Sequence, residues 1–99
     1  MLHIVNKSPF ERNALASCLR IASPGSALLL IEDAVYAATT QQAWEPRIRE
    51  AARQLEVYVL TADLEARGVR PRVIEEVRLL DYGGFVDLVV EHAVVQSWL

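Results

Sequence analysis

Cysteine is nearly absent from this sequence, because Cys18 is the only one among 99 residues. A single cysteine excludes an internal disulfide and any metal site that needs several thiolates. The two histidines, His3 and His92, lie far apart in the chain and have no cysteine or carboxylate around them at ligand spacing. We therefore predict no metal site and no cofactor.

Phosphate-binding motifs and long apolar runs are also missing. The chain has neither GxGxxG nor GxxxxGK[ST], so no nucleotide site is predicted. The longest apolar run, "ALLLI", is far too short to span a bilayer. The opening "MLHIVNKSPF" lacks the basic start and apolar stretch of a secretory leader. We expect a cytoplasmic protein with no membrane contact.

Positive charge is in short supply as well. The net charge is -3 and the pI about 5.3, with the arginines scattered among acids. Direct nucleic-acid binding needs a clustered basic face and is not expected. The apolar fraction, in contrast, is 53%. A domain of this size has little interior, so we expect some of these side chains to form an interface or a groove.

Short apolar runs alternate with helical patterns along the chain. Strands are predicted at 2–5, 26–31, 56–60 and 77–81, with a fifth in the tail 93–99. The uninterrupted run "SALLLI" is typical of a strand covered on both faces. This rhythm predicts a single α/β domain over residues 1–99, with about five mainly parallel strands and helices on both faces. Because the helices are few and short, we expect another subunit to complete one face.

The first helix has the clearest predicted start. Ser8 is the expected N-cap, Pro9 the first helical residue and Glu11 the partner in a capping box. The helix should end before Pro24. Its predicted buried stripe comprises Phe10, Ala14, Leu15, Cys18, Leu19 and Ala22. Later boundaries are expected at Pro46 (a start), Thr61 and Asp81 (caps) and Gly68 (a stop).

Polar residues should meet at the carboxyl edge of the sheet, where ligands bind in open α/β folds. The segments concerned are 6–8, 32–33, 61–63 and 81–83. Lys7 with Ser8 is a possible anion site at a helix N-terminus, although capping alone explains Ser8. Glu32 and Asp33 are a possible acid/base pair, although capping of a helix by Asp33 is the favoured role.

Cys18 has two interpretations, a sulfur nucleophile or a small apolar core residue. It lies in the middle of the predicted helix, past the first turn where the helix dipole favours a thiolate. Its neighbours one turn away are all apolar, and such surroundings raise the pKa of a thiol. Packing is the favoured interpretation, and a reactive Cys18 would need an activating group from elsewhere.

Five stretches in order along the chain resemble the DsrH/TusB family of sulfur-relay subunits. They are "MLHIVNKSPF", "ALLLIEDAVYAA", "VYVLTADLEARGV", "LLDYGGFVDLVVEH" and "VQSWL". The resemblance implies a DsrE-like fold and a place in a cytoplasmic hetero-oligomer, usually a heterohexamer, with two related subunits. It also implies that the complex holds sulfur as a cysteine persulfide and passes it to a small carrier protein.

The resemblance covers two branches, dissimilatory sulfur oxidation and formation of 2-thiouridine at tRNA wobble positions. A cysteine in the first helix after "NKSPFER", which Cys18 matches, favours the oxidation branch. The main sulfur-accepting cysteine of such complexes lies on another subunit. Cys18 is then at most a secondary persulfide site, and a purely structural subunit is the alternative. Trp98 is a candidate interface anchor, or it packs in its own core.

Overall fold

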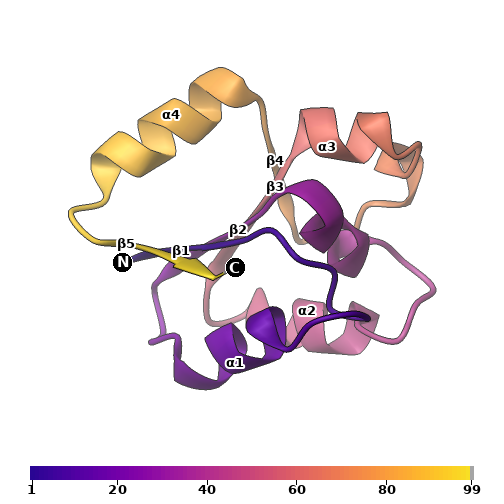
Figure 1. Cartoon of the computed structure of the whole chain (residues 1–99), viewed down its shortest axis with the longest axis horizontal. Coiled ribbons are helices and arrows are strands. Elements are labelled where there is room, and N and C mark those ends of the chain that lie inside the picture. The colour runs from indigo at the N-terminus through magenta and orange to yellow at the C-terminus, as the bar shows by residue number, and fades with distance from the viewer. Residues whose placement is uncertain (99) are drawn as a thin grey trace.

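A computed structural model describes residues 1–98, which form one five-stranded parallel sheet (Figure 1). The strands are β1 (Leu2–Val5), β2 (Ala27–Leu30), β3 (Glu56–Leu60), β4 (Arg78–Leu80) and β5 (Val95–Trp98). Their order across the sheet is β4-β3-β2-β1-β5. The predicted α/β class and all five strands are confirmed. Leu99, part of the predicted tail strand, lies outside the described residues.

The central strand β2 is buried along its whole length, as its unbroken apolar sequence predicts. It pairs with β1 on one side and β3 on the other, with Leu29 beside both Ile4 and Tyr58. The edge strands β4 and β5 are mostly exposed. The sheet therefore has a dry centre and two open edges.

The helical elements are α1 (Ala14–Ile21), α2 (Glu45–Ala51), α3 (Thr61–Ala66) and α4 (Tyr82–Glu91), with short 3-10 helices η1 (Glu32–Ala38) and η2 (Arg70–Arg72). Successive strands β1 to β4 are neighbours, so right-handed crossovers place their connections on one face. The return from β4 to β5 runs the other way and places α4 on the opposite face. None of the helices within residues 1–98 is long and apolar enough to cross a bilayer.

The two faces of the sheet differ greatly in their cores. The larger core, under α1, η1, α2 and α3, contains Leu15, Cys18, Val35, Ile48 and Leu64. The smaller core lies under α4, and its buried members among residues 1–98 are Leu2, Ala27, Leu29 and Leu88. One helix thus covers a whole sheet face, and completion of a face by another subunit stays a prediction.

The predicted start of the first helix is wrong. Residues 9–11 form a turn, and α1 begins at Ala14 after Asn13. The Ser8 hydroxyl accepts from the Phe10 amide at 3.2 Å, a local turn that replaces the predicted bond from Glu11. Phe10 is consequently 56% exposed rather than part of the buried stripe.

The remaining members of that stripe lie as predicted. Leu15 and Cys18 are fully buried, and Ala14, Leu19 and Ala22 pack against the same core. The helix ends at Ile21, before Pro24.

Among the later boundaries, Asp81 and Gly68 behave as predicted. The Asp81 Oδ1 accepts from the Gly84 amide at 2.7 Å, and Gly68 follows α3 with a φ of 66°. Pro46 lies in the first turn of α2. Thr61 is the first residue of α3 and makes no capping bond, so its predicted role is wrong. The cap position belongs to Leu60 because β3 runs directly into α3.

Candidate functional site

The carboxyl edge of the sheet joins three of the four predicted polar segments. The Glu32 amide donates to Asp63 Oδ2 at 2.7 Å, and the Asn6 side-chain amide donates to Glu32 Oε2 at 3.4 Å. Glu32 has a φ of 50°, in the left-handed region. Asp63 thus holds a strained turn at the end of β2, and this is a structural role.

Arg67 forms ion pairs with two carboxylates at this edge. Its guanidinium lies 2.9 Å from Asp33 Oδ1 and 3.9 Å from Asp63 Oδ1. Asp33 therefore forms an ion pair and does not cap η1, whose cap position is Ile31 and has no side-chain bond. With both aspartates paired to one cation, the geometry does not support an acid/base pair of Glu32 and Asp33.

Lys7 and Ser8 do not form the suggested anion site. The helix starts at Ala14 rather than at Pro9, so no helix N-terminus adjoins Lys7. The Ser8 side chain is buried and occupied by the Phe10 amide. Lys7 itself is exposed. The delayed helix start removes the electrostatic basis of that site.

Cys18 is fully buried among Val5, Leu15, Leu28 and Leu30 in the larger core. Burial raises the pKa of its thiol to about 11. At pH 7 a group with this pKa is ionised in on the order of one molecule in ten thousand. In this chain the thiol is therefore neutral and shielded, as the packing interpretation expects.

Trp98 binds within its own chain. Its indole Nε1 donates to His3 Nδ1 at 3.2 Å, and the two rings lie 6.2 Å apart. This contact fastens β5 to β1 at the sheet edge. His3 is buried, and burial together with the nearby N-terminal amine lowers its pKa, so the neutral imidazole accepts the bond. Trp98 is half-buried, and its role as a partner anchor stays a prediction.

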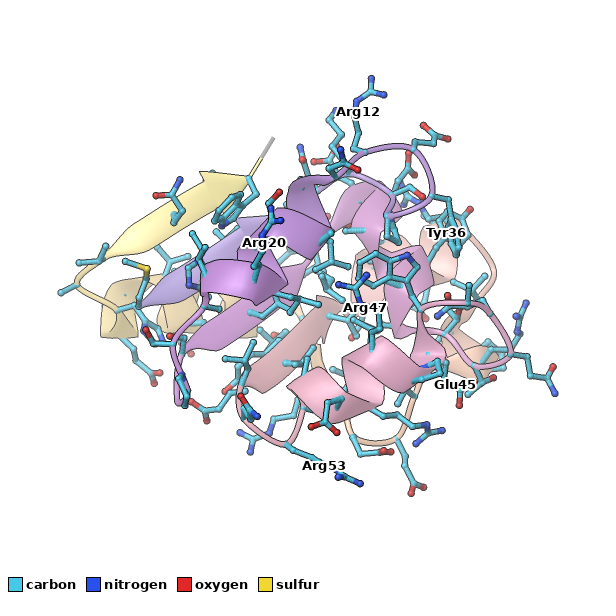
Figure 2. The ribbon with its side chains drawn as sticks, turned by 90° about the horizontal axis from the view of Figure 1, so that it is seen from below. Arg12, Arg20, Tyr36, Glu45, Arg47 and Arg53 are labelled. Carbon is cyan, nitrogen blue, oxygen red and sulfur yellow. The ribbon has the colours of Figure 1, made fainter. Side chains whose placement is uncertain are left out.

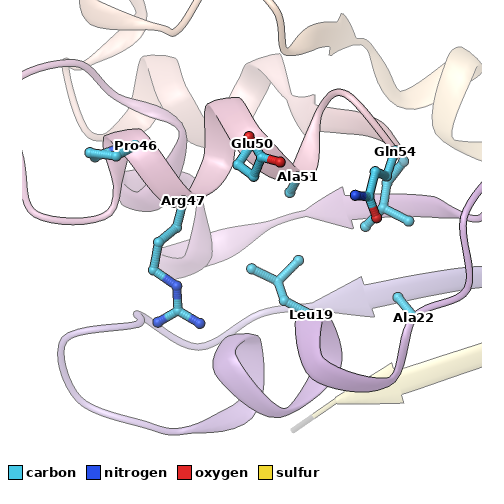
Figure 3. A pocket seen from close by; sticks show the side chains of 8 residues that line it. Leu19, Ala22, Pro46, Arg47, Glu50, Ala51 and Gln54 are labelled. Atoms are coloured by element: carbon cyan, nitrogen blue, oxygen red, sulfur yellow. The ribbon is translucent and has the colours of Figure 1, made fainter.

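A groove between α1 and α2 was not predicted from the sequence (Figure 3). It has a volume of about 350 Å³ and is lined by Leu19, Ala22, Pro46, Arg47, Glu50, Ala51, Gln54 and Leu55. The Arg47 guanidinium stacks 4.0 Å from the centre of the Trp44 ring. The pairing of Trp44 with a cation three residues later was the available signal in the sequence.

One positive and one negative side chain, Arg47 and Glu50, line this groove. Figure 2 shows Arg47 on α2, Arg53 just after α2, Arg20 on α1 and Arg12 in the loop before α1. Glu50 and Arg53 form a loose surface pair at 3.5 Å. Within residues 1–98 no group of three or more histidine, cysteine or acidic side chains could hold a metal.

Comparison of the sequence with known proteins identifies the family of this chain. The model described as "DsrH like protein" matches residues 7–95. Two Escherichia coli K12 proteins named TusB are each 37% identical over 98 residues, covering 99% of this chain and all of theirs. The chain belongs to the DsrH/TusB family. This is the family of sulfur-relay subunits that the five sequence stretches resemble, and the resemblance is confirmed.

Solved structures agree on the fold. The crystal structure of the ychN protein from E. coli superposes with a TM-score of 0.77, covering 97% of each chain at 19% identity. A protein of unknown function from Methanobacterium thermoautotrophicum gives 0.74 at 15% identity, covering 97% of this chain and 95% of its own. At these identities the likeness supports the fold alone.

The burial of Cys18 predicts a thiol that resists modification. In the isolated chain, alkylation at neutral pH should be at least about 100-fold slower than in denaturant, because both ionisation and access are restricted. Mass spectrometry after timed iodoacetamide exposure measures this rate. Labelling as fast in the folded chain as in denaturant would contradict a buried thiol.

The contact between His3 and Trp98 predicts acid sensitivity. Because the folded pKa of His3 is lowered from 6.5, the unfolded state binds more protons below that pH, and stability falls as the pH drops. A protonated His3 can no longer accept from Trp98. As the pH is lowered through 6.5, the melting temperature of the wild type should fall. The fall should be smaller in His3→Gln. His92→Gln is the matched control and should keep the full dependence.

Proposed function

We propose that this chain is a scaffold subunit of a hetero-oligomeric sulfur-relay complex, in which a related subunit provides the cysteine that accepts sulfur. Support from the sequence comes from the family match over residues 7–95 and the TusB relatives. Support from the structure comes from Cys18, the only cysteine in the chain, which is fully buried. The burial of that thiol is the single observation that favours a scaffold over a sulfur donor.

The chemistry of sulfur relay explains why burial matters. An acceptor thiolate attacks the terminal sulfur of a donor persulfide, a new S–S bond forms, and the donor leaves as a thiolate. The exchange needs no external oxidant or reductant. It does need an acceptor that is ionised and reachable. Cys18 has a pKa of about 11 and no exposed surface, so it meets neither condition in the isolated chain.

Cys18 as a secondary persulfide site is the competing proposal. It requires assembly to move α1 away from β1 and β2, which exposes the thiol, and to favour its ionisation through solvent or a nearby cation. Burial is the one cause of the raised thiol pKa, and no cation within the described chain offsets it. Under this proposal the complex, and not the single chain, would ionise Cys18.

The wider setting follows from the family. We infer a cytoplasmic complex with two related DsrE-like subunits and a small sulfur-carrier protein as the acceptor. The E. coli relatives named TusB favour the branch that makes wobble 2-thiouridine in tRNA. The position of Cys18 after "NKSPFER" favours the sulfur-oxidation branch, which the comparisons do not confirm.

The scaffold proposal predicts where sulfur is found. After a persulfide donor is added to the co-purified complex, mass spectrometry should find one extra sulfur atom on a sister subunit and none on this chain. Cys18→Ala should transfer sulfur to the carrier within about twofold of the wild-type rate, because alanine keeps the site apolar. Ser17→Ala, the preceding position in α1, controls for a change in the helix. Extra sulfur on this chain, with transfer lost only in Cys18→Ala, would establish the competing proposal.

Membership of the tRNA branch predicts a cellular outcome. Expressed with its sister subunits in E. coli cells that lack TusB, the chain should restore 2-thiouridine to tRNA, measured by nucleoside mass spectrometry. Unchanged tRNA, despite an assembled complex, would reject the tRNA branch and favour sulfur oxidation. Expression of the sister subunits without this chain is the control.

A further inference from the structure

Helix α4 has more apolar surface than the sheet can bury. Phe85, Leu88 and Val89 pack against the smaller core. Three further apolar side chains, Tyr82, Val86 and Val90, are 62%, 61% and 79% exposed. They are spaced four residues apart, so they lie in one row along the helix. We name this row the α4 outer strip.

The α4 outer strip continues onto the neighbouring sheet edge. Val94, just before the edge strand β5, and Val95, its first residue, are 52% and 40% exposed. The Leu2 amide donates to the Val94 carbonyl at 2.9 Å, which brings the exposed Met1 to the same place. An apolar hollow of about 190 Å³ is lined by Phe85 and Val89 together with Val86 and Val90 of the strip. Figure 1 shows α4 standing apart from the other helices, beside the β5 end of the sheet.

A patch of this kind on a small domain indicates a protein contact. Scattered exposed valines need no explanation, but here they are contiguous and flank a hollow. The sheet beneath is also thinly covered, since Ile4 and Ile31 on that face stay half-buried beside α4. The surface therefore fits a partner that supplies apolar side chains.

Charge narrows the choice of partner. Residues 79–99 contain three acids, Asp81, Asp87 and Glu91, and no lysine or arginine. The preceding cation, Arg78, is paired with Glu56 at 3.2 Å and lies over the Tyr58 ring. A second copy placed against this surface would bring the same acids together, and such like-charge contacts oppose association.

We propose that the α4 outer strip docks a sister subunit through an apolar surface flanked by arginine or lysine. This inference rests on the proposed function for the identity of the partner and adds the surface and its chemistry. Apolar contact supplies the affinity, and the acids of α4 select a basic rim and reject self-association. Assembly would then complete the sheet face that α4 covers alone.

The test uses the full chain co-expressed with its sister subunits. Val86→Glu and Val90→Glu should each weaken retention by tagged partners at least about 100-fold, because a carboxylate would be buried in the contact. Ile21→Glu, on α1, is the matched control, because Ile21 is 64% exposed on the other side of the sheet. It should assemble like the wild type. Circular dichroism melts verify that all three variants fold.

A second arm tests the charge. Asp87→Arg combined with Glu91→Arg should weaken assembly, and high salt should weaken the wild-type complex and have less effect on this variant. Glu11→Arg, in the loop before α1, is the control and should leave assembly unchanged. Undiminished assembly of the Asp87→Arg, Glu91→Arg variant would overturn the proposal that the partner surface has a basic rim.

Sedimentation of the chain alone decides between partners. A monomer is expected, and a homodimer that Val86→Glu disrupts would overturn the sister-subunit proposal in favour of a second copy. If all α4 variants assemble normally while the complex still transfers sulfur, this inference fails and the proposed function stands. If the α4 variants block assembly of a complex that holds no sulfur, the surface stands and the proposed function fails.

Discussion

The direction in which strands are added to the sheet is the constraint on which the rest of this structure depends. From β1 to β4 each strand lies beside the previous one, so right-handed connections place α1, η1, α2 and α3 on one face. Only the return from β4 to β5 reverses direction and places a helix on the other face. The molecule is consequently lopsided, with a thick core on one side and a single helix on the other.

This lopsidedness determines what each face can do. On the thick side Cys18 is one of many side chains packed without exposed surface, and desolvation keeps its thiol protonated. On the thin side the sheet lacks enough helical cover, and apolar residues of α4 stay in solvent. A chain built this way offers a contact surface more readily than a nucleophile. The thin side is where a relay complex would gain most from a neighbouring subunit.

The polar residues at the carboxyl edge illustrate how a place that often binds ligands becomes structural. Asp63 accepts from the Glu32 amide and stabilises its left-handed backbone, and Arg67 neutralises Asp33 and Asp63. Asp33 and Asp63 therefore pair with Arg67 and stabilise the fold at this edge. Around α2 two of the arginines are likewise paired with acids, whereas α4 carries acids without a lysine or arginine.

The sequence by itself determined the strands, the class of the fold and the buried nature of Cys18. Strands such as "ALLL" and "EVYVL" need only local apolar runs, and the apolar neighbours of Cys18 one helical turn away already indicated a core position. Tertiary structure decided the rest. A turn at Ser8 replaces the predicted helix start. Asp33 pairs with Arg67 and does not cap a helix as predicted. The pairing of β5 with β1 places Trp98 beside His3. The Ser8 turn is a local alternative to the predicted cap. The other two outcomes join residues distant in the chain, which the spacing of neighbours cannot specify.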